Sequence, residues 1–207
     1  MNDEAAVDVD ENPFSTRFVR PGAIDYLFPG NENLELLVMR WREAGLRGEI
    51  VGPHGSGKST LLTALQARLT AEGWRTFRCD LHDGQRSLPS GWLQGRCGEP
   101  RAVIAIDGYE QLSRWQRSRV LAGCQRRGCG LVVTAHATVG LPALWTTRVD
   151  PARAEALFRR LTATAPAFVT VHDLHVSLLC HPTDLRSVWF ELYDLYEQRR
   201  RARSAER

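Results

Sequence analysis

The chain has 207 residues, a formal net charge of +3 at pH 7 and 25% charged residues, which is ordinary for a globular protein. This length allows one full domain, or one domain with a small appendage. The sequence holds no apolar run long enough to span a membrane, and the N-terminus is acidic rather than signal-like, so we expect a cytoplasmic protein.

The two ends of the chain differ in charge. Residues 1–12 are acidic and contain no base, and we expect them to form a disordered tail. Residues 204–207 are expected to be the end of a basic tail. Between prolines and glycines, residues 13–30 carry aromatic side chains that need burial, either across a sheet edge or over a bound ligand. The following residues, 31–44, have the apolar spacing of an amphipathic helix.

A glycine-rich loop follows a short strand predicted at 47–52. It fits the pattern G-x-x-x-x-G-K-[ST] of a phosphate-binding loop, and apolar residues at helical spacing follow it over 58–70. Glycines let backbone N–H groups surround a polyphosphate, and the positive end of the following helix points at the same phosphates. The predicted nucleotide-binding residues are Gly52, Pro53, His54, Gly55, Ser56, Gly57, Lys58, Ser59 and Thr60.

Lys58 is the only lysine in a chain whose other basic residues are all arginine. A compact ammonium at this position can neutralise the β- and γ-phosphates, which makes Lys58 a catalytic candidate. The hydroxyl of Ser59 is a candidate ligand for Mg²⁺. The pattern therefore predicts ATP and Mg²⁺ as cofactors.

A second signal comes at the end of a buried strand. After a strand at 74–80 and a polar, glycine-rich stretch at 81–100, residues 102–107 form an apolar run that ends in Asp107. A carboxylate here either holds Mg²⁺, as in the Walker B motif, or caps the next helix. Glu110 is the candidate that orients the attacking water, or else a glutamate favoured by a helix start.

The remaining elements continue an alternating α/β pattern. A helix is predicted at 109–127 and a buried strand at 130–136, whose polar residues Thr134 and His136 would emerge at the ligand-binding edge of the sheet. Thr134 either senses the γ-phosphate or bonds a neighbouring loop. A shorter fifth strand is predicted at 145–150, and helices are predicted at 151–164, 171–181 and 184–203.

The cysteines show no C-x-x-C pair among Cys79, Cys97, Cys124, Cys129 and Cys180. The spacing favours free thiols over disulfides or a zinc site. His172, His175 and His181 do not share one helical face, which argues against a metal site there.

The order of these motifs resembles the additional-strand class of P-loop ATPases, with AAA+ and NACHT-type proteins the nearest. Asp107, Gly108 and Glu110 match the NACHT form of Walker B. The resemblance implies an α/β core with a five-stranded, mainly parallel sheet in the order 5-1-4-3-2. The core would span residues 13–150, followed by a short C-terminal helical lid at 151–203.

The same resemblance implies roles for two further residues. Thr134 falls at the sensor 1 position. Arg186, within Thr183-Asp184-Leu185-Arg186, resembles the sensor 2 arginine, which reaches the γ-phosphate from the lid. No arginine precedes the last strand where family members carry an arginine finger, and Arg148 is the closest.

The combined pattern predicts a Mg²⁺-dependent ATPase that couples the nucleotide state to lid movement. A nucleotide or small-molecule kinase is one alternative, and a non-hydrolysing ATP switch or scaffold is another, because Gly108 occupies the usual position of the catalytic glutamate. A protein partner or effector fits each alternative. Nothing in the sequence favours a nucleic-acid partner or an ABC transporter subunit.

Overall fold

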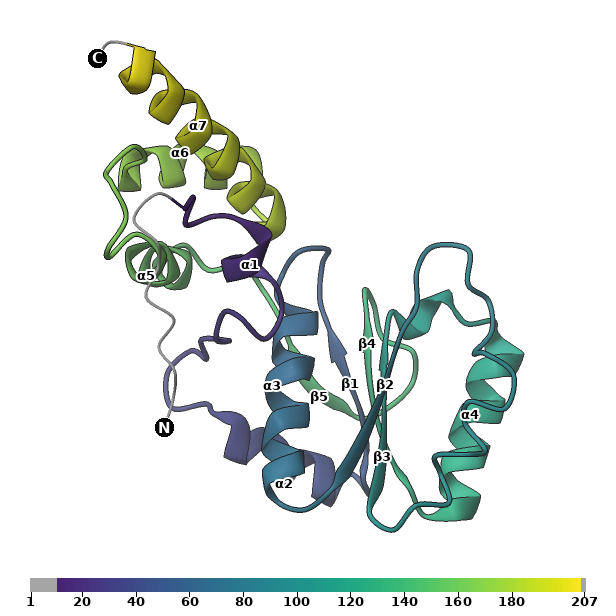
Figure 1. The fold of residues 1–207 in the computed structure, drawn as a ribbon. Helices are drawn as coiled ribbons and strands as arrows, with labels where there is room; N and C mark the ends of the chain where they lie inside the picture. Colours follow the sequence, from purple (N-terminus) through teal and green to yellow (C-terminus); the bar gives the residue numbers. More distant parts are fainter. Residues whose placement is uncertain (1–10, 206–207) are drawn as a thin grey trace. The chain divides into compact units, whose positions relative to one another are not determined.

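The computed structural model describes residues 11–205, which contacts divide into two units. The sheet unit contains residues 25–53 and 57–147, and the helical unit contains residues 11–24, 54–56 and 148–205. None of the helices in this range has the length and apolar character needed to cross a membrane. The elements labelled in Figure 1 are α1 (Thr16–Val19), α2 (Leu34–Glu43), β1 (Arg47–Val51), α3 (Lys58–Ala71), β2 (Arg75–Asp80), β3 (Ala102–Asp107), η1 (Tyr109–Gln111), α4 (Arg114–Arg127), β4 (Gly130–Ala135), β5 (Ala143–Thr146), α5 (Pro151–Leu161), α6 (Val171–Cys180) and α7 (Leu185–Ala205).

The sheet unit is built on five parallel strands in the order β2-β3-β4-β1-β5. This confirms the predicted order 5-1-4-3-2. Helices α2 and α3 cover one face, and α4 covers the other (Figure 1). Because β3 and β4 lie in the middle with helices on both sides, apolar residues fill nearly their whole length. All the carboxyl ends therefore meet at one edge, where the glycine-rich loop and Asp107 follow their strands.

Two predicted elements differ from the structure. The fifth strand lies at Ala143–Thr146 instead of 145–150, because buried Leu144 anchors it and the following residues leave the sheet to begin α5 at Pro151. The predicted helix 109–127 is interrupted, since Leu112 is extended and the Ser113 hydroxyl caps α4.

In the helical unit, α5, α6 and α7 are joined by residues 11–24, which include α1, and by residues 54–56. The ring of Phe14 is 1% exposed and stacks on Phe158 at 5.7 Å and on Trp189 at 6.0 Å. The amide of Asn12 donates hydrogen bonds to the carbonyl of Tyr193 at 3.0 Å and to Glu197 at 2.9 Å.

These contacts change the predicted domain boundaries. The predicted nucleotide-binding core begins at residue 13, but residues 13–24 belong to the helical unit. The reason is that Phe14 packs against Phe158 on α5 and Trp189 on α7. Of the predicted acidic tail, residues 1–10 lie outside the described residues, and Asn12 is buried. Helix α7 continues past residue 203 to Ala205, and residues 206–207 lie outside the described range.

Phe14→Ala is expected to destabilise the helical unit by about 3–5 kcal/mol, because it removes a buried ring and leaves a cavity between Phe158 and Trp189. Urea unfolding followed by circular dichroism measures the loss. Phe18→Ala is the matched control, since the Phe18 ring is only partly buried. Equal losses in the two variants would contradict this account of the packing.

Candidate nucleotide-binding site

The glycine-rich loop connects β1 to α3 at the carboxyl edge of the sheet. Gly55 and Gly57 have φ angles of +65° and +92°. These left-handed conformations favour glycine and turn backbone N–H groups toward one side of the loop. Gly57 is the N-cap of α3, so the N–H groups of the first helical turn, which have no acceptor within the helix, begin where the loop ends. A glycine-containing loop that leads into a helix is the local pattern found at many anion-binding sites.

The side chain of Lys58 folds back over its own loop. It is 9% exposed, and its Nζ donates hydrogen bonds to the carbonyl oxygens of Gly52 at 2.8 Å and Pro53 at 2.7 Å. Both acceptors are neutral, and hydrogen bonds between two charged groups are stronger. Phosphate oxygens can therefore replace these carbonyls as partners of the ammonium.

The carboxylate of Asp107 accepts hydrogen bonds on both oxygens. Oδ2 lies 2.8 Å from Nη2 of Arg78, and Oδ1 accepts a short hydrogen bond from the hydroxyl of Thr134. The N–H of Gly108 in turn donates to the Thr134 hydroxyl at 3.0 Å. Thr134 is fully buried, so its side chain holds Asp107 in place and does not face solvent.

Arg78 on β2 is a site residue that the motif analysis missed. Its guanidinium also lies 2.7 Å from Oδ1 of Asp80 and donates to the Thr63 hydroxyl on α3 at 2.7 Å. The signal in the sequence was the i, i+2 spacing of Arg78 and Asp80, which puts both side chains on one face of a strand beside Asp107. Arg78 therefore supplies positive charge beside the predicted metal-holding carboxylate.

The geometry around Gly108 explains why no glutamate directly follows Asp107. Gly108 has a φ of +78°, and a β-carbon there would lie 2.8 Å from the carbonyl oxygen of Leu81. A side chain at this position would therefore be strained and would collide with backbone. An acid that serves the site would therefore have to come from another position in the chain.

Glu110 provides such an acid. Its Oε1 lies 2.9 Å from Nε2 of His136, which follows β4 at the same edge of the sheet. Its Oε2 is buried and has no hydrogen-bond partner among the described residues. A buried carboxylate oxygen without a donor has unused capacity to accept a hydrogen bond, for example from a water molecule.

Arg186 lies in the helical unit, whereas Lys58 and Asp107 lie in the sheet unit. In the helical unit Asp184 accepts a hydrogen bond from the backbone N–H of Arg186 at 3.0 Å and lies 3.7 Å from Nδ1 of His54. Burial opposes ionisation of Asp184, but hydrogen bonds from Ser187 and the nearby His54 outweigh it and lower the pKa of Asp184. Asp184 is therefore a carboxylate at neutral pH.

The donor set at this edge of the sheet suits Mg²⁺. The ion prefers oxygen ligands and keeps several waters of its own. Ser59 offers a hydroxyl, and each oxygen of Asp107 keeps a lone pair beyond the hydrogen bonds from Arg78 and Thr134. Ser59 and Asp107 therefore fit a magnesium ion held partly through water.

No family model matches this sequence, and no curated protein sequence matches it significantly. Solved structures share its fold. The replication initiator DnaA bound to AMPPCP and single-stranded DNA is 13% identical, with a TM-score of 0.56 over 80% of this chain and 61% of that chain. A Walker-type ATPase of Pyrococcus abyssi is 12% identical, with a TM-score of 0.50 over 93% of this chain and 81% of that chain.

The chain thus spans less than two thirds of the DnaA chain that it matches. At these identities the likeness shows the fold, which is that of the additional-strand P-loop NTPases. This is the fold that the sequence resemblance implied.

Proposed function

We propose that the chain binds ATP at residues 52–60 and hydrolyses it in the presence of Mg²⁺. One observation carries the proposal: a buried lysine begins the helix after a glycine-rich loop, at the sheet edge where a buried strand ends in Asp107. The glycine-rich loop and its lysine suit a polyphosphate, and the aspartate at the end of the strand suits the metal ion that accompanies it. The fold shared with the Pyrococcus abyssi ATPase supports the same function.

Each candidate residue has a distinct role in this proposal. Backbone N–H groups of residues 55–58 would hold the phosphates, and Lys58 would neutralise charge that develops on the β–γ bridge. Mg²⁺, when bound by Ser59 and Asp107, supplies further neutralisation. Glu110 would orient water against the γ-phosphate with its buried Oε2, while His136 holds the other oxygen.

Thr134 and Arg186 would transmit the nucleotide state. A change in the charge at Asp107 alters its hydrogen bond with the Thr134 hydroxyl, and Arg186 is carried by the helical unit. Hydrolysis would then change the arrangement of α5, α6 and α7 and alter the surface offered to a protein partner.

A non-hydrolysing ATP switch is the second candidate function. Gly108 excludes an acid from the position directly after Asp107, and Arg78 already neutralises that aspartate. A chain with these features could bind ATP without a competent base. The two functions differ in phosphate release, which can be measured directly.

Glu110→Gln is expected to lower the rate of phosphate release about 10²-fold while ATP still binds, because the amide keeps the shape of the side chain and loses its basicity. Steady-state phosphate release from Mg–ATP measures the rate, and equilibrium dialysis with labelled ATP measures binding. Glu43→Gln, on the exposed side of α2, is the matched control.

Three results would revise the proposal in different ways. Unchanged turnover in Glu110→Gln would remove this acid from the mechanism. ATP binding without phosphate release by the unmodified chain would favour the switch. Phosphate release that depends on an added nucleotide or small-molecule acceptor would identify a kinase.

A further inference from the structure

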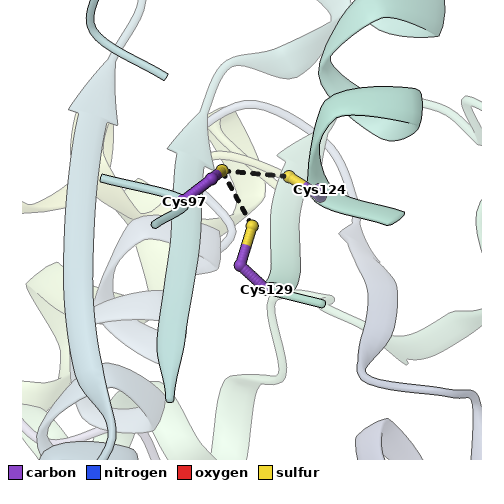
Figure 2. Close-up of side chains that lie close together, drawn as sticks. All are labelled: Cys97, Cys124 and Cys129. Atoms are coloured by element: carbon purple, nitrogen blue, oxygen red, sulfur yellow. Dashed lines mark hydrogen bonds between the residues drawn. The ribbon is translucent and has the colours of Figure 1, made fainter. Parts of the chain in front are cut away.

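Three of the five cysteines meet in the sheet unit although they are far apart in the sequence (Figure 2). Cys97 lies between β2 and β3, Cys124 lies near the end of α4, and Cys129 directly precedes β4. Their sulfur atoms all lie within 4.8 Å of one another. Cys97 Sγ is 2.8 Å from Cys129 Sγ and 4.0 Å from Cys124 Sγ. A single ion could contact all three.

The separations suit ligands of one metal ion. Zinc–sulfur bonds are about 2.3 Å long, so sulfurs around one zinc are about 3.8–4.0 Å apart. The distance between Cys97 and Cys124 already has this value, and the distance between Cys97 and Cys129 needs to open by about 1 Å. Cys97, Cys124 and Cys129 are 1%, 0% and 6% exposed, among apolar neighbours such as Ile104 and Leu131.

Hydrogen bonds connect the three sulfur atoms: Cys129 Sγ donates to Cys97 Sγ, and Cys97 and Cys124 share a second hydrogen bond. Side-chain interactions with Cys124, and with Cys97 to a smaller degree, lower the pKa of Cys129 to about 6, although burial opposes this. Burial raises the pKa of Cys97 to about 12, and the hydrogen bond to Cys129 is the main cause of a raised pKa at Cys124. The guanidinium of Arg127 lies close enough to favour the anionic form at Cys97 and Cys129. Metal ions bind the thiolate form of cysteine, so a bound ion would displace thiol protons from this group.

We propose that Cys97, Cys124 and Cys129 form a three-thiolate binding site for one thiophilic metal ion, Zn²⁺ or Cu⁺. Soft sulfur ligands select these ions over Mg²⁺. Among residues 11–205 no histidine or carboxylate joins the group, so the protein supplies three ligands there. This assignment goes beyond the free thiols favoured by the cysteine spacing.

The position of the site indicates a structural role. Cys129 precedes β4 and Gly52 follows β1, and these neighbouring strands are parallel, so the cysteines and the phosphate-binding loop lie at opposite edges of the sheet. A bound ion would link the long connection 81–101 to α4 and β4. The metal would therefore stabilise the sheet unit without entering the nucleotide chemistry.

The test is a metal titration of the full chain, reduced and kept free of oxygen, against a chromophoric chelator. Zn²⁺ and Cu⁺ are titrated separately, and their relative affinities identify the preferred ion. We expect one ion per chain, a raised melting temperature, and slower alkylation of Cys97, Cys124 and Cys129 with metal than without it, with the labelling of Cys79 and Cys180 unchanged by metal. Because it uses the unmodified chain, the labelling pattern does not depend on how a variant folds.

Cys129→Ser is expected to weaken metal affinity at least about 100-fold, and Cys180→Ser, at an exposed position, to leave it unchanged. Three outcomes would overturn the site: no ion bound to the unmodified chain, equal labelling of all cysteines with metal present, or full affinity in a folded Cys129→Ser variant.

Discussion

Replacing Lys58 with alanine is expected to lower the affinity for Mg–ATP about 10³-fold, because two charge-assisted hydrogen bonds to phosphate oxygens, worth about 1.5–3 kcal/mol each, are lost. The chain has no other lysine, and Lys58 Nζ donates hydrogen bonds to two backbone carbonyls of its own loop. Isothermal titration calorimetry with a non-hydrolysable ATP analogue measures the change.

Two further variants test whether ATP binding depends on the positive charge at position 58 or on the size and shape of the side chain there. Lys58→Arg keeps the positive charge but places a broad guanidinium at a position that is 9% exposed, so we expect it to restore little binding. Arg68→Ala removes a basic residue from the same helix, where it pairs with Glu72, and is expected to bind the analogue normally. Equal affinity in Lys58→Ala and the unmodified chain, with both folded by circular dichroism, would contradict the assignment.

Asp107→Asn is expected to slow phosphate release about 10³-fold, because the neutral amide no longer compensates the charge of Mg²⁺ and no longer pairs with Arg78. The shape of the side chain is preserved, and the Thr134 hydroxyl keeps an oxygen acceptor. Phosphate release is measured over a range of Mg²⁺ concentrations, and the variant is expected to need more Mg²⁺ for its remaining activity.

Asp80→Asn is the matched control for this experiment. Asp80 ends the neighbouring strand and pairs with the same arginine, but its side chain is 50% exposed. An exposed pair contributes little, so we expect less than about a fivefold change in rate. Similar rates of phosphate release in the two variants would show that Asp107 is not the carboxylate that holds Mg²⁺.

Local sequence predicted the centre of the sheet unit well. The apolar run 102–107 is the strand β3 at the same residues, because a strand buried on both faces leaves an uninterrupted apolar signal. The glycine-rich loop likewise predicted its own strand and helix, since the motif needs both. The strand order came from the resemblance, and the structure confirms it.

Features that depend on distant contacts could not be predicted. The sequence around Phe14 does not indicate that the Phe14 ring packs against Phe158 and Trp189, because both residues are more than a hundred positions away in the chain. The cysteine cluster has no local spacing pattern, because Cys97 and Cys129 approach only through the pairing of β3 with β4. Arg78 was missed for the same reason, since its partner Asp107 lies on the neighbouring strand.

The most direct test of the central claim is a crystal structure of the chain with a non-hydrolysable ATP analogue and Mg²⁺. We predict a triphosphate in the loop formed by residues 52–60, with Lys58 Nζ moved from the carbonyls of Gly52 and Pro53 to the β- and γ-phosphates. A saturated crystal with this loop empty, or with the nucleotide bound elsewhere, would contradict the account.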